Sequence, residues 1–249
     1  MLLYLHGGGY TLGSPTAYAQ LAAGLARSAG TACFSVDYRL APEAPYPAGI
    51  DDAVAAYRGL LAEHAPESIL VGGDSAGGGL TLALLLTLLH EGLPMPAGAV
   101  LLSPWTDLTF TGASMRTKAE DDPTLTEEGL RVAAAHYAGD TPPNGPRISP
   151  VFADLTGLPP LLIEVGEAEI LLSDSTRVAA NAAEAAVDVT LHAWPGMIHD
   201  WPAFSFALSE GREAIAEVGT WARARLDAAA VATDGAPGQG ASGAEGGEA

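Results

Sequence analysis

Residues Gly73–Gly77 read Gly-Asp-Ser-Ala-Gly, a G-x-S-x-G motif whose flanks make it informative. The apolar run 68–72 before the motif predicts a short buried strand, and the Leu- and Ala-rich run 78–90 after it predicts a helix. A sharp strand-to-helix turn of this kind admits only small residues at both glycine positions and pushes the serine hydroxyl out above the sheet. The N-terminus of the following helix points free N–H groups at any developing negative charge. The motif therefore predicts that Ser75 is a catalytic nucleophile.

A second glycine-rich loop lies near the start of the chain. The apolar run 2–5 predicts a strand that leads into His6–Gly9, which reads His-Gly-Gly-Gly. An oxyanion hole needs backbone N–H groups that side chains do not obstruct, and a glycine-rich loop upstream of a G-x-S-x-G turn supplies them. We expect the hole to consist of the N–H groups of Gly8, Gly9 and Ala76. The histidine of the loop is expected to orient it rather than to transfer protons.

A nucleophilic serine also needs a base, and in this type of site the acid and then the base follow the serine along the chain. The sequence has six histidines, of which only His199 lies in a loop after the last predicted strand. His6 precedes the serine, and the remaining four fall in predicted helices or in a strand. Position therefore predicts that His199 is the base. Asp200 and Pro202 then have the pattern of a helix start, with a cap residue before a proline.

The acid is less sharply defined, because three carboxylates follow the apolar strand 160–166. Glu167, Glu169 and Asp174 all lie where a carboxylate could reach the histidine ring. Asp174 also has the position of a cap on a helix over 175–186, and Glu167 has that of a solvated loop charge. The residues themselves leave the three alternatives open.

Apolar segments alternate with helical ones along the chain, which favours a parallel sheet covered by helices on both faces. We expect strands at 2–5, 31–37, 69–73, 98–103, 160–166 and 187–194, and helices at 16–29, 49–64, 76–91, 173–186 and 202–228. The interval 105–150 interrupts the alternation with Pro, Thr and acidic residues around one amphipathic stretch, Glu127–Ala138. The segment 229–249 has no periodicity and is rich in Ala, Gly, Ser and Glu, so we expect one domain over 1–228 and then a disordered tail.

Five segments together resemble those of the bacterial esterases of the hormone-sensitive lipase family. They are HGGG at 6–9, DYRLAPE at 37–43, GDSAGG at 73–78, SPWTDL at 103–108 and GMIH at 196–199, and the resemblance extends over residues 1–225. It implies an α/β-hydrolase fold, a three-layer sandwich with a mainly parallel sheet of about six strands here and a partial helical lid to which the 105–150 insertion contributes. In that family the acid lies in a G-x-x-D-x-L pattern, which here reads GEAEIL over 166–171 and places Glu169 at the acid position. Glutamate replaces the commoner aspartate, and this fold accepts either acid.

Full-length members of the family have cap helices and two leading strands before the HGGG strand, whereas this sequence starts one residue before that strand. The strand 31–37 would then lie at an exposed edge of the sheet, followed in space by 2–5 and then by the later strands in sequence order. Because an unpaired edge favours association, we expect a homo-oligomer through this edge. An absent cap would also leave the acyl pocket open to water.

These features predict a serine hydrolase that cleaves carboxylic esters of short to medium acyl chains through a Ser75, His199 and Glu169 triad and an acyl-enzyme. Two alternatives remain open at this point. One is a hydrolase-like ligand-binding module that has lost catalysis, and the other is a lactonase or amidase on the same site. Neither a metal nor an organic cofactor is expected, because no group of His, Cys and carboxylates shows ligand spacing.

The composition limits the partners and the compartment. The formal net charge of −19 and the pI near 4.4 argue against nucleic acid and anionic membranes. The longest apolar stretch, 80–89, is too short to span a bilayer, and no signal-peptide pattern opens the sequence. The single cysteine, Cys33, excludes an internal disulfide and suits a reducing compartment. We therefore expect a cytoplasmic enzyme with a small-molecule ester substrate and no stable membrane insertion.

Overall fold

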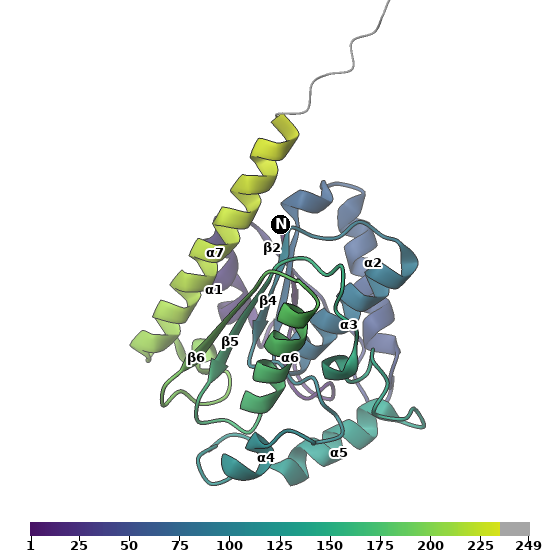
Figure 1. The fold of residues 1–249 in the computed structure, drawn as a ribbon, viewed down its shortest axis with the longest axis vertical. Helices are drawn as coiled ribbons and strands as arrows, with labels where there is room; N and C mark the ends of the chain where they lie inside the picture. Colours follow the sequence, from purple (N-terminus) through teal and green to yellow (C-terminus); the bar gives the residue numbers. More distant parts are fainter. Residues whose placement is uncertain (235–249) are drawn as a thin grey trace, which may run out of the picture.

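Six parallel strands form the centre of the fold in the computed structural model, which describes residues 1–234 and the side chains of residues 1–228 (Figure 1). The strands are β1 (Leu2–Leu5), β2 (Cys33–Ser35), β3 (Leu70–Asp74), β4 (Gly98–Leu102), β5 (Leu161–Gly166) and β6 (Val189–Trp194). Their order across the sheet is β2-β1-β3-β4-β5-β6, and every neighbouring pair is parallel. Both the parallel sheet and the strand order confirm the expectation from the sequence.

Helices cover both faces of the sheet, as Figure 1 shows. They are α1 (Ala19–Ala29), α2 (Ala48–Leu61), α3 (Ala76–Glu91), α4 (Ser114–Thr117), α5 (Glu127–Ala138), α6 (Leu172–Glu184) and α7 (Ser209–Asp234), with short 3-10 helices η1 (Pro66–Ser68), η2 (Pro150–Phe152) and η3 (Trp201–Phe204). Helices α1 and α7 pack on one face, and α2, α3 and α6 pack on the other. The fold is therefore the predicted three-layer sandwich.

Alternation along each strand divides the core between the two helical layers. In β1, Leu3 and Leu5 belong to the larger core cluster on the side of α2, α3 and α6. Leu2 and Tyr4 belong to the smaller cluster on the side of α1 and α7. Helix α3 is buried along most of its length, because it lies between the sheet and α2 and has no solvent-facing stripe.

The edge strand β2 is shorter than the predicted strand 31–37. Only Cys33–Ser35 pairs with β1, and Phe34 leaves 46% of its surface exposed. Within residues 1–234, β2 pairs only with β1, so its outer edge has unpaired backbone groups. Self-association through this edge stays a prediction.

The predicted helix 202–228 was wrong as one continuous element. The chain forms η3 at Trp201–Phe204 and begins α7 only at Ser209. Between the two, the N–H groups of Ala207 and Leu208 both bond the Phe204 carbonyl and close a turn. Asp200 does stand at the cap position before η3, but its side chain makes no capping hydrogen bond.

The interval 105–150 contains α4 and α5, which lie at the lower end of the molecule in Figure 1. Helix α5 coincides with the predicted amphipathic stretch. Its N-cap is Thr126, whose hydroxyl accepts from the Gly129 N–H at 3.2 Å, and Glu127 and Glu128 occupy the first turn, where negative charge stabilises the helix dipole.

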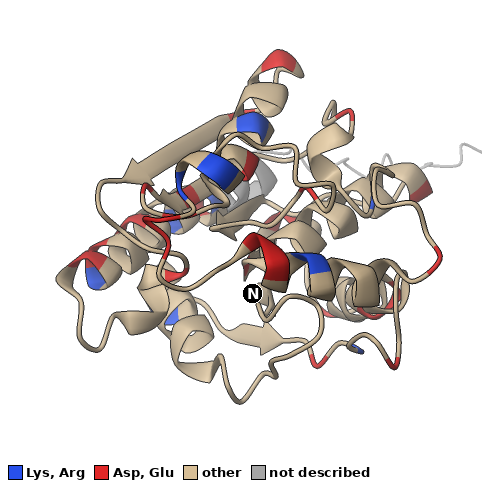
Figure 2. Ribbon diagram, turned by 90° about the horizontal axis from the view of Figure 1, so that it is seen from below, with Lys and Arg blue, Asp and Glu red and all other residues tan. Residues whose placement is uncertain are grey.

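Helix α7 continues to Asp234, beyond the predicted helix end at residue 228. The rest of the predicted tail, 235–249, lies outside the described residues. No helix within residues 1–234 combines the length and the apolar character needed to cross a bilayer. Figure 2 shows acidic positions spread over many elements, with Lys and Arg scattered among them, as the excess of 30 acidic over 11 basic residues requires.

Candidate active site

Ser75 is the single residue between the end of β3 at Asp74 and the start of α3 at Ala76. Its backbone has φ 52° and ψ −120°, a conformation that L-residues rarely adopt and that is kept only where the surroundings enforce it. The Ser75 N–H donates to the Leu102 carbonyl at 2.8 Å, and the Ser75 carbonyl accepts from the Trp105 N–H at 2.9 Å. These bonds tie the turn to the end of β4, so the serine side chain is held at the carboxyl end of the sheet.

The two motif glycines are required by close backbone packing. A Cβ on Gly77 would overlap the Leu5 carbonyl oxygen, and a Cβ on Gly73 would overlap both that oxygen and the Gly77 carbonyl oxygen. The start of α3 therefore lies directly against the end of β1. This confirms the sequence-based reason for small residues on either side of the serine.

His199 lies in the loop after β6 and faces the serine. Its Nε2 is 2.9 Å from the Ser75 Oγ. The loop is held against the end of β5, where the Ala168 N–H donates to the Met197 carbonyl at 2.9 Å and where a Cβ on Gly166 would overlap the same oxygen. The absence of a side chain at Gly166 therefore allows the loop that carries His199 to pack directly against the end of β5.

Glu169 is fully buried on the other side of the imidazole. Its Oε2 lies 3.5 Å from the His199 Nδ1 and accepts a 2.8 Å hydrogen bond from the Ser103 hydroxyl. Contacts between a base and its orienting acid are often long before a substrate binds. Burial raises the pKa of Glu169, while His199 and Ser103 oppose that shift.

The two other candidate acids have different partners. Glu167 has an exposed side chain that pairs with Lys118. Asp174 is buried within the first turn of α6, and its Oδ2 accepts from the N–H groups of Thr106 and Asp107 at 2.7 and 2.8 Å. The expected helix-capping role of Asp174 was wrong, because Leu171 is the cap and the carboxylate instead fixes the turn after β4. Of the three, Glu169 is the carboxylate that faces His199.

The expected oxyanion-hole residues lie around the same hydroxyl. Gly8 and Gly9 have φ 110° and 62°, and Ala76 is the first residue of α3. Within the described chain, the N–H groups of all three have no hydrogen-bond acceptor. They are therefore available to an oxygen bound next to Ser75.

Asp74, which sequence reasoning did not single out, ties this loop to the serine turn. Its Oδ1 accepts from the Gly7 N–H at 3.0 Å and from the Tyr4 hydroxyl.

His6 is buried and stacked on Tyr38, with ring centroids 4.3 Å apart, and burial lowers its pKa. A buried, stacked imidazole fits the expectation that His6 orients the loop.

Asp200 is a second carboxylate on the imidazole, and it too was missed. Its Oδ2 lies 3.2 Å from the His199 Nε2, and its backbone has φ 53°. Burial of the ring opposes its charge, but the carboxylates of Asp200 and Glu169 outweigh burial, so the pKa of His199 lies well above its ordinary value. The only sequence signal was adjacency to His199, which equally fitted a helix cap.

A cavity of about 350 Å³ opens above the serine. Ser75, His199, Asp200, Gly8 and Gly9 form its floor, and α5 with the residues before it forms one wall. The remaining lining residues are Thr11, Leu12, Tyr18, Thr124, Leu125, Thr126, Gly129, Leu130 and Ala133. The 105–150 insertion thus borders the site, which is the position expected of a lid.

Comparison with known proteins identifies the fold and the family. A family model described as the alpha/beta hydrolase fold matches residues 2–203. An acetyl-hydrolase of Streptomyces hygroscopicus is 45% identical over 223 residues, which are 89% of this chain and 75% of that protein. An esterase of Acinetobacter venetianus is 39% identical, with 89% of this chain and 74% of that protein covered. The chain therefore spans about three quarters of the length of these relatives.

Solved structures give the same result. The crystal structure of EstE5 superposes with a TM-score of 0.90 at 46% identity, covering 91% of this chain and 77% of that chain. An esterase from the bacterial hormone-sensitive lipase family superposes with a TM-score of 0.89 at 47% identity, covering 90% and 76%. This chain belongs to the α/β-hydrolase fold family and, within it, to the carboxylic-ester hydrolases of the bacterial hormone-sensitive lipase family.

Proposed function

We propose that this enzyme hydrolyses carboxylic esters of short to medium acyl chains through an acyl-enzyme on Ser75. The observation that carries the proposal is the 2.9 Å separation of the Ser75 Oγ and the His199 Nε2 at the floor of the cavity. A serine hydroxyl is a weak nucleophile at neutral pH, and an imidazole within hydrogen-bond reach removes its proton as it attacks. Glu169 would orient and stabilise that imidazole from the Nδ1 side.

The first half of the reaction transfers the acyl group. His199 accepts the Ser75 proton while Oγ forms a bond to the ester carbonyl carbon, and the carbonyl oxygen becomes an oxyanion. The free N–H groups of Gly8, Gly9 and Ala76 stabilise that charge. Breaking the bond to the alcohol oxygen then releases the alcohol, which takes its proton from the imidazolium.

The second half restores the enzyme. A water molecule gives a proton to the neutral His199 and attacks the acyl carbon, and the same N–H groups stabilise the second oxyanion. The imidazolium returns its proton to Oγ as the acid product leaves. Glu169 stays ionised throughout, because its role is to hold the tautomer and to balance the imidazolium charge.

The lining of the cavity supports an acyl chain of short to medium length. Leu125, Leu130 and Ala133 provide apolar surface on the wall opposite the serine loop, which suits a short acyl chain. Similar proteins point in the same direction, since one relative is named an acetyl-hydrolase and EstE5 crystals were soaked with p-nitrophenyl butyrate. Acetyl and butyryl esters are therefore the substrates to test first.

The direct test measures turnover of p-nitrophenyl acetate and butyrate by the purified chain and by the Ser75→Ala variant. We expect measurable turnover by the wild type and a loss of at least about 10³-fold in kcat for the variant, because the covalent nucleophile is gone. Circular dichroism should show an unchanged fold, since the Ser75 side chain makes no hydrogen bond that supports the turn. A variant that keeps more than a few per cent of wild-type turnover would refute the assignment of Ser75.

A further inference from the structure

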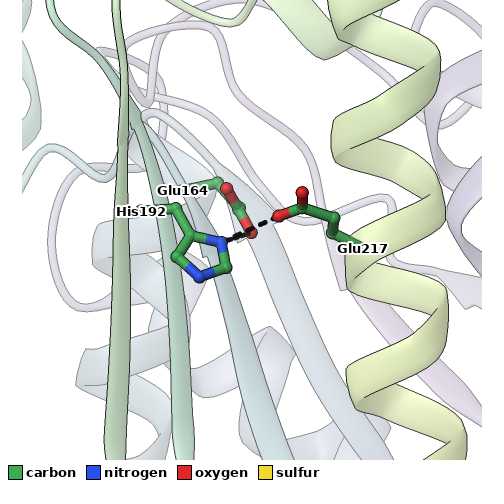
Figure 3. Close-up of side chains that lie close together, drawn as sticks. All are labelled: Glu164, His192 and Glu217. Atoms are coloured by element: carbon green, nitrogen blue, oxygen red, sulfur yellow. Dashed lines mark hydrogen bonds and ion pairs between the residues drawn. The ribbon is translucent and has the colours of Figure 1, made fainter.

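Three ligand-type side chains meet on the face of the sheet that carries α7, away from the serine. Glu164 comes from β5, His192 from β6 and Glu217 from α7, and Figure 3 shows them pointing at one another. The His192 Nδ1 lies 3.2 Å from the Glu164 Oε1 and 2.9 Å from the Glu217 Oε2. The three residues are far apart in the sequence, so no spacing motif indicates that they form a cluster.

The buried carboxylate is held in one orientation. Glu164 is completely buried, and its Oε2 accepts a 2.5 Å hydrogen bond from the Trp194 indole N–H. This bond leaves Oε1 directed at His192. Outer hydrogen bonds of this kind orient metal-ligating carboxylates in proteins and are as much part of such sites as the ligands.

The two carboxylates of the cluster share one imidazole. Among the described residues, the ion pairs of Glu164 and Glu217 involve His192 and no Lys or Arg. One imidazole N–H can donate fully to only one of the two carboxylates that face it. A cation shared by all three groups would satisfy both.

We propose that Glu164, His192 and Glu217 bind a divalent transition-metal cation of the Zn²⁺ type. Two carboxylate oxygens and one imidazole nitrogen form a three-ligand set of the kind Zn²⁺ accepts, with water in the fourth position. Ligands about 2.0–2.1 Å from one tetrahedral ion lie about 3.3 Å from each other. The two carboxylate oxygens lie 3.2 and 2.9 Å from the His192 Nδ1, and all three ligand atoms lie within 4.8 Å of one another. The imidazole disfavours Mg²⁺ and Ca²⁺, which take oxygen ligands.

Access and role follow from the position of the ligands. The side chains of His192 and Glu217 are 45% and 48% exposed, so an ion can enter and keep a water molecule. Bound there, it would join α7 to β5 and β6, the two strands that lead to Glu169 and His199. The ion would therefore stabilise the fold and take no part in the ester chemistry.

The test uses the full chain, which is first freed of bound metal by chelator treatment and dialysis. Binding of Zn²⁺ is then measured by calorimetric titration. We expect one Zn²⁺ per chain at this cluster, and a rise in Tm on its addition. Either His192→Ala or Glu217→Gln should weaken that binding at least about tenfold and abolish the Tm rise. Glu217 lies on an exposed helix face, so its variant keeps the fold even if His192→Ala does not. A visible absorption band of bound Co²⁺ should disappear in both variants.

Matched controls separate this site from general attraction to an acidic surface. Glu213→Gln removes the same charge from the same helix, and His136→Ala removes an exposed imidazole from α5. Both should bind Zn²⁺ as the wild type does, and Mg²⁺ should leave the Tm of every form unchanged. Wild-type protein that binds no Zn²⁺, or that binds it no better than the His192 and Glu217 variants, would overturn the proposal.

Discussion

The Asp200 carboxylate lies 3.2 Å from Nε2 of His199, the nitrogen that also faces the Ser75 hydroxyl at 2.9 Å. The proton-accepting nitrogen of the proposed base thus has a carboxylate on the substrate side as well as Glu169 behind it. Both charges favour the imidazolium, and together they hold the pKa of His199 well above its ordinary value. An imidazole that retains its proton cannot accept another from serine, so Asp200 should restrict activity to higher pH.

Replacing Asp200 by Asn should therefore move the acid limb of the pH–activity profile. The base works only when neutral, so kcat/KM rises as pH increases through the pKa of His199. Removing one carboxylate lowers that pKa, and the rise should shift to lower pH. The measurement is kcat/KM for p-nitrophenyl butyrate across the acid limb, with the exposed Asp140→Asn as a control of equal charge change. An unshifted limb in Asp200→Asn would show that its carboxylate does not act on the base.

The acid can be identified with three conservative variants. Glu169→Gln should lower kcat on the order of 10⁴-fold, because a neutral side chain no longer balances the imidazolium and can select the wrong tautomer. Glu167→Gln should change kcat by less than a few-fold, since that side chain is exposed and bound to Lys118. Steady-state kinetics on all three variants, with Asp174→Asn as the third, gives the ranking. A larger loss in Glu167→Gln or Asp174→Asn than in Glu169→Gln would move the acid.

Asp174 should affect stability more than rate. Its Oδ2 accepts both backbone N–H groups of the turn after β4, and an Asn can present a carbonyl oxygen in the same place. Asp174→Asn should therefore stay close to wild type, whereas Asp174→Ala leaves two buried donors without an acceptor. We expect the alanine variant to lose about 1–3 kcal/mol in the free energy of unfolding in urea. Equal stability of the two variants would contradict this role.

The tightness of the serine turn gives a stability prediction of its own. Gly77→Ala places a methyl group onto the Leu5 carbonyl oxygen, so β1 and α3 must separate. The free energy of unfolding should fall by about 3 kcal/mol, and activity should fall with it. Gly59→Ala is the matched control, since among the described residues nothing outside its own stretch of helix lies within 4 Å of its Cβ, and α2 should gain about 0.5–1 kcal/mol. Comparable urea midpoints for the two variants would count against the packing described here.

Selectivity for acyl length should be shallow. Each fully buried methylene contributes about 0.8 kcal/mol, so a closed pocket would separate acetyl from hexanoyl esters by more than about tenfold in kcat/KM. Leu12 on the rim of this cavity is 71% exposed, so an acyl chain that extends as far as Leu12 remains partly in water. We expect only a few-fold difference between the two esters. A steep rise in kcat/KM with each added methylene would indicate a closed pocket.

Local motifs carried most of what the sequence could predict. The strand, glycine and serine pattern around Ser75 specifies its turn because backbone packing there depends on residues adjacent in the chain. The alternation of strands and helices predicts the parallel sheet, whereas the strand order depended on the family resemblance. The choice of Glu169 as the acid depended on the family resemblance, because sequence position alone did not distinguish it from two other carboxylates.

Contacts between distant segments could not be predicted in this way. From its sequence position before Pro202, Asp200 looks only like a helix cap. Its approach to the His199 Nε2 depends on a left-handed backbone conformation, which the sequence pattern does not reveal. The break before Ser209 arises where the N–H groups of Ala207 and Leu208 turn back onto Phe204. The Glu164, His192 and Glu217 cluster arises only when α7 packs on the sheet.

Covalent labelling asks directly whether Ser75 is a nucleophile activated by His199. The enzyme is treated with phenylmethanesulfonyl fluoride while residual esterase activity and intact mass are followed together. We predict one adduct per chain, located on Ser75 by peptide mass spectrometry, with activity lost in proportion. Labelling should be slowed about 10²–10⁴-fold in His199→Ala, because the general base is missing. An adduct on another serine, or full labelling of Ser75 with activity retained, would show that Ser75 is not the catalytic nucleophile.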